Sequence, residues 1–148
     1  MRIQWDERVP EPLLTQWHGW VESLPLVAKI KIPRCFRKSS HATTTSVQLH
    51  YFSDASNHGY AAVSYLSLAD DQGGVHCAFV MGKTRNTPLK QWSVPRLELQ
   101  AAVVSTRLHV LIHDELDLPV QRVSFWTDSL TVLQYITEKI RFKPFIAN

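Results

Sequence analysis

The segment VQLHYFSD, residues 47–54, alternates apolar and polar side chains over most of its length. Val47, Leu49 and Tyr51 would face a core on one side, and the residues between them would face the other side. This pattern predicts a β-strand that ends at Asp54. The end of a strand is a position where functional sites collect in α/β proteins, so the segment bears on fold and function together.

Two further strands are predicted soon after this one, at residues 59–68 and 75–81. The segment DDQGG, residues 70–74, is a strong turn signal between them. Connections this short favour an antiparallel meander of three strands. Residues 83–91 are mostly polar, and we predict that they form a loop.

A helix, a strand and a second helix are predicted in the remainder of the chain. Pro95 opens the first helix, which extends to about His113 and is apolar on most sides. The strand is predicted at residues 120–127, and the second helix at residues 129–139. The order β-β-β-α-β-α predicts an α/β fold with a mixed sheet, in which a crossover places the first and fourth strands side by side and parallel.

Three acids fall at junctions of these elements: Asp54 and Asp128 at strand ends, and Glu98 in the first turn of the long helix. Parallel neighbouring strands would bring the two aspartates to one edge of the sheet. Clustered carboxylates repel one another unless a cation lies between them, and their hard oxygens suit Mg²⁺ or Mn²⁺. Two such ions can activate water for phosphodiester cleavage. The alternative is that the aspartates only cap turns or helices.

The first 45 residues differ in character from residues 46–148, so we predict two parts. Apolar residues at helical spacing predict a short amphipathic helix over residues 11–23, which Pro25 would end. Alternation predicts a short basic strand within residues 28–36. A solvated face is the alternative to a binding site for its basic side chains.

The composition of the 148-residue chain is that of an ordinary globular protein, with a mildly basic pI of about 9.0 and a formal charge of +3. This charge permits a nucleic-acid partner without requiring one. The two cysteines form no CxxC motif, which favours a reducing, intracellular setting, cytoplasmic or nuclear. No apolar run reaches the roughly 18 residues of a membrane span, so no membrane partner is expected.

Three segments resemble, in order, the motifs of retroelement ribonuclease H domains: YFSDAS at residues 51–56, PRLELQAA at 95–102 and FWTDS at 125–129. Retroviral-type integrases share this fold but place their acids in a different order, so they fit worse. The chain is most similar to BEL/Pao-type retrotransposon polyproteins. The segments that carry this likeness are Trp5-Asp6, the pair Trp17 and Trp20, Ile32-Pro33-Arg34, and RFKPFIAN at residues 141–148.

The resemblance implies a ribonuclease H-like mixed sheet and a site in which Asp54, Glu98 and Asp128 are catalytic and bind two Mg²⁺ or Mn²⁺ ions. It implies hydrolysis of the RNA strand of an RNA–DNA hybrid. It also identifies residues 1–45 as a connection segment to an adjacent reverse transcriptase domain. In the family the domain continues with a fifth strand and a helix that carries a fourth acid.

The sequence ends at Asn148, before both of these elements, so we expect an incomplete domain, whose activity the loss of the fourth acid would impair. Whether the chain is an enzyme is therefore left open. The alternative function is a non-catalytic remnant that binds nucleic acid or has a structural role.

Polar and basic residues near the acids are candidates for nucleic-acid contacts. Ser56 and Asn57 follow the first acid, where they could meet a sugar or phosphate, with turn formation as the alternative. The basic candidates lie between the third strand and the second acid, where the alternative is a solvated loop. They are Lys83, Arg85, Lys90 and Arg96.

Two histidines, His109 and His113, have the i, i+4 spacing of some zinc sites. Because no glutamate lies between them in an HExxH arrangement, the sequence favours an ordinary helix surface.

Overall fold

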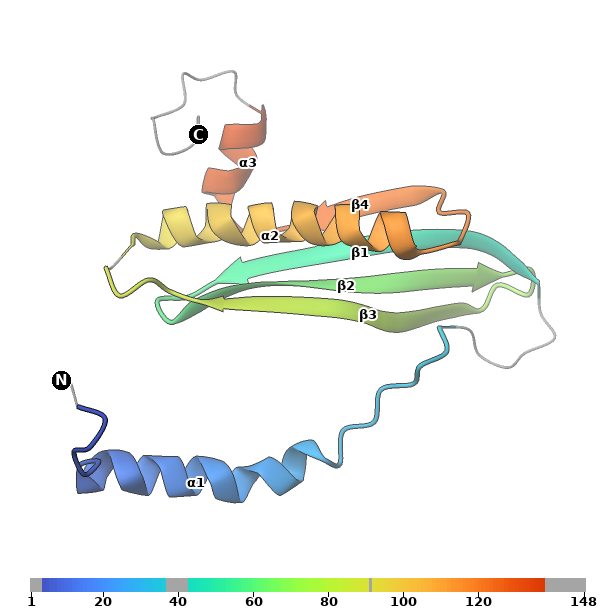
Figure 1. Cartoon of the computed structure of the whole chain (residues 1–148). Helices are drawn as coiled ribbons and strands as arrows, with labels where there is room; N and C mark the ends of the chain where they lie inside the picture. Colours follow the sequence, from blue (N-terminus) through green and yellow to red (C-terminus); the bar gives the residue numbers. More distant parts are fainter. Residues whose placement is uncertain (1–3, 37–42, 91, 138–148) are drawn as a thin grey trace. The chain divides into compact units, whose positions relative to one another are not determined.

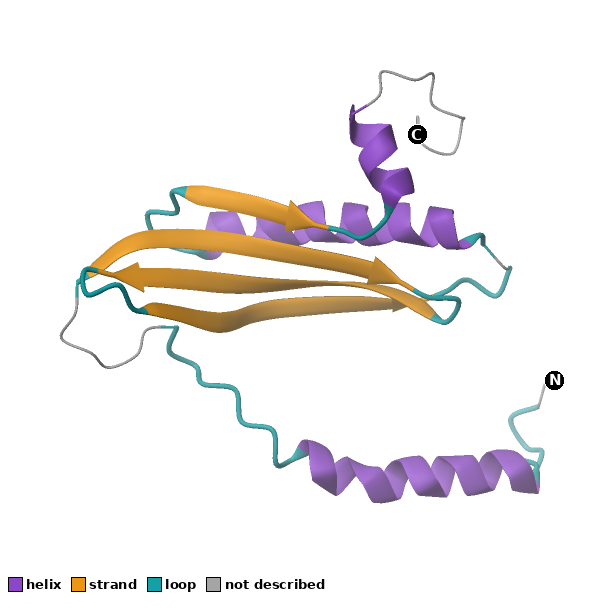
Figure 2. Ribbon diagram, turned by 180° about the vertical axis from the view of Figure 1, so that it is seen from behind, coloured by secondary structure: helices purple, strands orange, loops and turns teal. Residues whose placement is uncertain are grey.

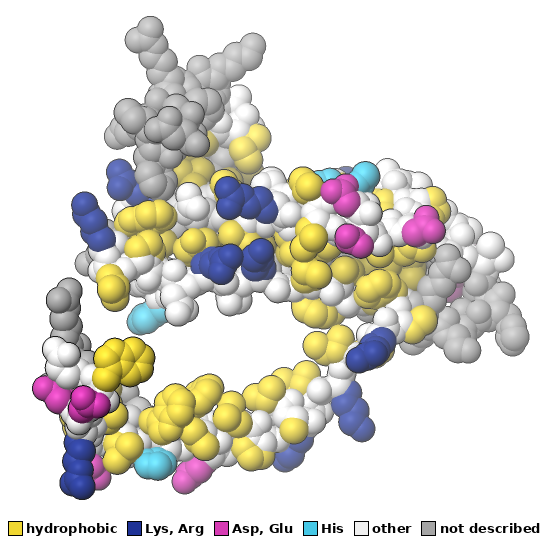
Figure 3. All heavy atoms as spheres, in the orientation of Figure 1, with side chains coloured by type: hydrophobic (Ala, Val, Ile, Leu, Met, Phe, Trp, Pro, Cys, Tyr) yellow, Lys and Arg dark blue, Asp and Glu magenta, His cyan; other side chains and the backbone are white. Residues whose placement is uncertain are grey.

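The computed structural model describes residues 4–36, 43–90 and 92–137, and it divides the chain into two compact units, residues 1–33 and 34–148. The first unit is built around helix α1, Glu11–Val27, which begins after Pro10 (Figure 1). No residue of α1 is buried. Its apolar side chains form a band along the helix, visible in yellow in Figure 3, and the rings of Trp17 and Trp20 lie 5.0 Å apart.

Two predictions for this unit were wrong. Pro25 lies inside α1 and does not end it. Inside a helix a proline loses one backbone hydrogen bond and crowds the preceding turn, which disfavours the helix without forbidding it. Here α1 continues two residues beyond Pro25, to Val27. Residues 28–36 form no strand. Among the described residues, no neighbouring strand pairs with them, and a strand without a ladder partner is not stable.

The second unit contains a four-stranded mixed sheet with the order β3-β2-β1-β4. Strands β1 and β2 are antiparallel, as are β2 and β3, whereas β1 and β4 are parallel (Figures 1 and 2). The predicted α/β fold is thereby confirmed. The elements are β1 (Thr44–Ala55), β2 (Gly59–Asp70), β3 (Val75–Asn86), α2 (Val94–Glu115), β4 (Arg122–Trp126) and α3 (Leu130–Thr137).

The core lies between the sheet and α2. The inward residues of β1 are Val47, Leu49 and Tyr51, each at most 2% exposed, as the alternation predicts. They pack with Leu66 of β2 and Leu108 of α2 in one apolar cluster. Each such side chain contributes roughly 1.5–3 kcal/mol when it is fully buried, so this packing fixes β1 and α2 relative to each other.

The opposite face of the sheet carries one aromatic ring from each strand. Phe52 of β1 lies 6.1 Å from both Trp126 of β4 and Tyr65 of β2, and Tyr65 lies 5.9 Å from Phe79 of β3. The four rings form a row across the sheet, which begins at the paired residues Phe52 and Trp126 of β1 and β4.

The β2–β3 connection confirms the predicted turn. The Asp70 carboxylate accepts hydrogen bonds from the N–H groups of Gln72 and Gly74, at 3.0 and 2.6 Å. Gly73 has φ of 80°, which a glycine adopts without strain.

The prediction that a loop begins at residue 83 and extends to residue 91 was wrong for residues 83–86, because β3 extends to Asn86. Lys83 and Arg85 are therefore strand residues, paired with Ala62 and Tyr60 of β2. Residues 138 and 139 of the predicted second helix lie outside the described residues, as does the segment 141–148. Among the described parts of the chain, no helix has both the length and the apolar character to cross a bilayer.

Candidate active site

The register between β1 and β4 places two acids at the same level of the sheet. Phe52 pairs with Trp126 in this parallel ladder, and Asp54 and Asp128 each lie two residues further along their chains. The Ser53 hydroxyl donates a hydrogen bond of 3.5 Å to the carbonyl of Trp126, which joins the two segments just beyond the ladder. The two aspartates thus come together at the carboxyl ends of neighbouring parallel strands.

Both acids line one open hollow of about 450 Å³. Both are exposed, and Asp54 Oδ1 accepts a hydrogen bond of 2.6 Å from the N–H of Ala55. The hollow therefore combines two accessible carboxylates with an apolar wall. Its other lining residues are Phe52, Ser53, Ala61, Ala62, Val63, Trp126 and Thr127.

Glu98 is linked to this pair indirectly. It lies near the start of α2, and its Oε2 accepts a hydrogen bond of 2.6 Å from the hydroxyl of Ser129, the residue after Asp128. The same Ser129 Oγ accepts a hydrogen bond of 3.2 Å from the N–H of Val132, so Ser129 caps α3. Sequence reasoning gave Ser129 no role of its own. A serine directly before an apolar run is nevertheless a recognisable N-cap signal.

The donor set of the hollow fits a hard divalent cation, because carboxylate oxygens are the ligands that Mg²⁺ and Mn²⁺ prefer. Asp54 and Asp128 supply these oxygens. The Glu98 carboxylate is hydrogen-bonded to Ser129, the residue that follows Asp128. Within residues 4–36, 43–90 and 92–137, no three side chains of His, Cys, Asp or Glu are grouped closely enough to hold one ion. The structure thus brings Asp54 and Asp128 together and leaves Glu98 beside them.

A second hollow, of about 370 Å³, lies on the other side of Asp54, at the β1–β2 turn. Of the predicted nucleic-acid contacts, it contains Ser56 and Arg85, together with His58 and Asn86. The Ser56 hydroxyl accepts hydrogen bonds from the N–H groups of His58 and Gly59, at 3.2 and 3.3 Å. In this structure Ser56 therefore builds the turn.

The turn is fastened to the end of β3. The Thr87 hydroxyl donates hydrogen bonds to the carbonyls of Asn57 and His58, at 3.0 and 3.3 Å. A Cβ on Gly59 would lie 2.9 Å from the carbonyl oxygen of Arg85, so only glycine permits this close approach. The remaining predicted contacts are exposed but do not line either hollow: Asn57, Lys83, Lys90 and Arg96.

Comparison with known proteins agrees with this architecture. The family model described as "Pao retrotransposon-like RNaseH-like domain" matches residues 1–129, which include β1 to β4, α2 and all three acids. No curated protein matches the chain.

Proposed function

The chain belongs to the Pao retrotransposon-like RNaseH-like domain family, and from this premise we propose that it hydrolyses the RNA strand of an RNA–DNA hybrid with the help of Mg²⁺ or Mn²⁺. The observation that carries the proposal is the β1–β4 register, which puts Asp54 and Asp128 at one level beside a shared hollow. Neither exposed carboxylate forms a salt bridge among the described residues, so the chemistry of the pair favours a metal.

In this proposal Asp54 and Asp128 hold the cations, with Glu98 as the third acid. When bound, two hard divalent ions activate a water molecule and stabilise the leaving oxygen of a phosphodiester. Other contacts of the chain hold the three acids in position. Ser129 fixes the Glu98 carboxylate from the first turn of α3, and the β1–β4 ladder fixes the spacing of the two aspartates.

Contact with the nucleic acid is proposed through the hollow at the β1–β2 turn. Arg85 there supplies a positive charge next to Asp54, and the turn is held in place by Thr87. Each phosphate that the protein neutralises makes binding weaker as salt concentration rises. An adjacent reverse transcriptase domain, as a neighbour of residues 1–45, remains a prediction from the sequence.

The test is cleavage of a hybrid whose RNA strand is labelled, in Mg²⁺ or Mn²⁺, compared with chelator. We expect the wild-type chain to cleave the RNA strand. In Asp54→Asn and Asp128→Asn the cleavage rate should fall by at least about 100-fold, as it does when an enzyme loses a main electrostatic contact to the transition state. Glu115→Gln removes an exposed acid at the far end of α2 and serves as the matched control.

One specific outcome would favour the non-catalytic alternative. If the wild-type chain binds hybrid in a salt-sensitive manner but leaves it intact in either metal, the nuclease proposal fails and a nucleic-acid-binding function remains. A folded chain that neither binds nor cleaves any duplex would overturn both.

A further inference from the structure

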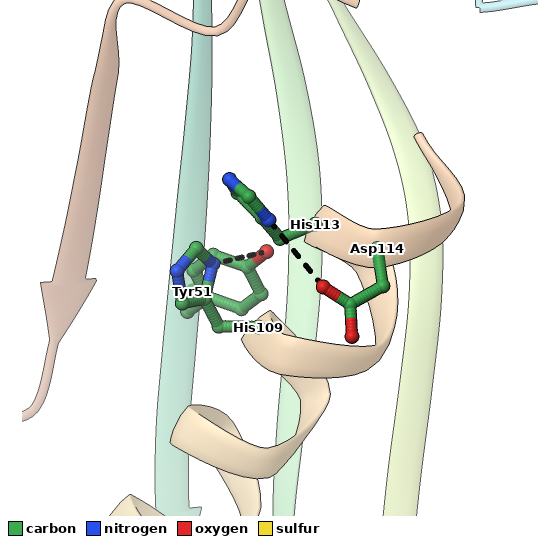
Figure 4. A network of polar contacts seen from close by, with 4 residues as sticks. All are labelled: Tyr51, His109, His113 and Asp114. Atoms are coloured by element: carbon green, nitrogen blue, oxygen red, sulfur yellow. Dashed lines mark hydrogen bonds and ion pairs between the residues drawn. The ribbon is translucent and has the colours of Figure 1, made fainter. Parts of the chain in front are cut away.

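Two histidines on α2 lie away from the three acids and have no role in the proposed function. His109 and His113 are one helical turn apart, so their side chains share a face of α2. His109 packs between the buried ring of Tyr51, at 5.3 Å, and the exposed ring of Phe125, at 5.6 Å, whereas His113 is exposed. Figure 4 shows the two rings next to each other near the end of the helix.

Each imidazole uses the same ring nitrogen for a contact within the protein. His109 Nδ1 lies 3.2 Å from the hydroxyl of Tyr51, and His113 Nδ1 lies 3.6 Å from Asp114 Oδ1. In both rings the Nε2 atom points away from these partners (Figure 4). A histidine that binds a metal through one nitrogen ordinarily donates its other N–H to a carboxylate or another oxygen, which fixes the ring.

The spacing of the two rings is close to that of a chelating pair. Their centroids are 5.6 Å apart, with an angle of 67° between the planes. Two imidazoles on one tetrahedral zinc ion, with Zn–N distances of about 2.0–2.1 Å, have centroids roughly 5 Å apart. Rotation of the exposed His113 side chain would bring the pair to this spacing.

The space in front of the pair can accept an ion with its waters. Both histidines line a hollow of about 440 Å³, together with Asp117 and apolar residues of the segment before β4. Asp117 adds a negative charge to this hollow. Burial lowers the pKa of the His109 imidazole below its ordinary value, and His113 acts in the same direction while Asp114 opposes it. The neutral imidazole is the form that binds metal.

We propose that His109 and His113 bind a divalent cation of the late first transition row, such as Zn²⁺, Ni²⁺ or Cu²⁺, through their Nε2 atoms. Imidazole nitrogens prefer these ions, whereas carboxylate oxygens prefer Mg²⁺ and Mn²⁺. The described residues offer no third close ligand of the His, Cys, Asp or Glu type, so water completes the coordination. The bound ion would lie in the hollow that the end of α2 and the segment before β4 line, independently of the acids at the other end of the helix.

The experiment is a titration of the metal-free full chain with ZnCl₂, followed by calorimetry and by ¹⁵N NMR of the histidine rings. We expect one ion to bind at this site, identified by a shift of the Nε2 signals of His109 and His113. Because binding to the folded state stabilises it, the midpoint of thermal unfolding should rise with zinc concentration. A large excess of MgCl₂ should not displace the ion.

Variants separate this site from adventitious zinc binding. His113→Gln changes an exposed side chain and should lower affinity by at least about tenfold, since even the loss of a supporting contact costs 10- to 100-fold. His76→Gln, on β3, is the matched control and should bind zinc as the wild type does. Equal affinity in wild type and His113→Gln, or no binding by folded wild type, would overturn the proposal. Neither result depends on nuclease activity.

Discussion

The Ser129 hydroxyl donates a hydrogen bond of 2.6 Å to the Glu98 carboxylate and thereby joins the start of α2 to the start of α3. Ser129 is only 5% exposed, so this contact is sheltered from water. The contact thus fixes the position of the Glu98 carboxylate through Ser129, which directly follows Asp128.

Replacement of Ser129 by alanine should therefore affect stability and activity together. The change removes the N-cap of α3 and the donor to Glu98, which should cost about 1–2 kcal/mol in the free energy of unfolding. Urea denaturation measures this cost, and hybrid cleavage should slow in parallel. Ser93→Ala is a matched control, because Ser93 precedes α2 without making a side-chain cap hydrogen bond. A Ser129→Ala chain as stable as Ser93→Ala would contradict the role given to this hydroxyl.

Glycine at position 59 should be required for the β1–β2 turn. In Gly59→Ala the new methyl group would meet the carbonyl oxygen of Arg85 at 2.9 Å, and a backbone atom cannot easily move away. We expect a loss of roughly 1–3 kcal/mol in unfolding free energy, as for overpacking elsewhere. Gly19→Ala on α1, where nothing lies within 4 Å, should instead stabilise the helix. Thermal or urea unfolding of the two variants compares them directly.

Alkaline unfolding should report on Tyr51. Burial raises the pKa of this phenol from 10.0 to about 12. Because the folded state holds the proton more tightly than the unfolded state, the stabilising effect is complete below pH 10 and is lost as the pH rises towards 12. Denaturant unfolding across this range should show falling stability in the wild type and a flatter profile in Tyr51→Phe. Identical profiles would show that Tyr51 does not titrate as its burial requires.

Acid unfolding should report on His109 in the opposite sense. Its pKa lies below the ordinary value of 6.5, so the folded state disfavours the protonated ring. The resulting stability is present above pH 6.5 and is lost as the pH falls through the lower, folded value. His109→Gln should flatten this acid limb, whereas His76→Gln should keep the wild-type slope. An unchanged slope in His109→Gln would assign the acid limb to other groups.

The sequence allowed much of the sheet to be predicted, because burial on one face leaves a direct pattern in the residues. The alternation at Val47, Leu49 and Tyr51 located β1, and the acid after it is one of the two that line the candidate site. The parallel pairing of β1 with β4 followed from the connectivity of strand, helix and strand.

Other features depend on contacts that the local sequence does not encode. Lys83 and Arg85 read as part of a polar loop, yet pairing with β2 extends β3 through them. Pro25 is a different case, because no residue of α1 is buried, so packing does not account for the helix continuing past this proline. The Ser129–Glu98 hydrogen bond joins residues 31 positions apart, and only the packing of α2 and α3 brings them within reach.

The β1–β4 ladder also has a consequence for the order in which the chain assembles. Strands β1, β2 and β3 are joined by short turns, whereas the hydrogen bonds between Val47 and Gln121 close a loop of 74 residues. Long loop closure costs entropy and slows folding, so we expect the hairpins to form first and β4 to join them late. Asp54 would then be in place well before Asp128. The paired acids are thus a late product of folding, and local opening of β4 would separate them while the rest of the sheet stays intact.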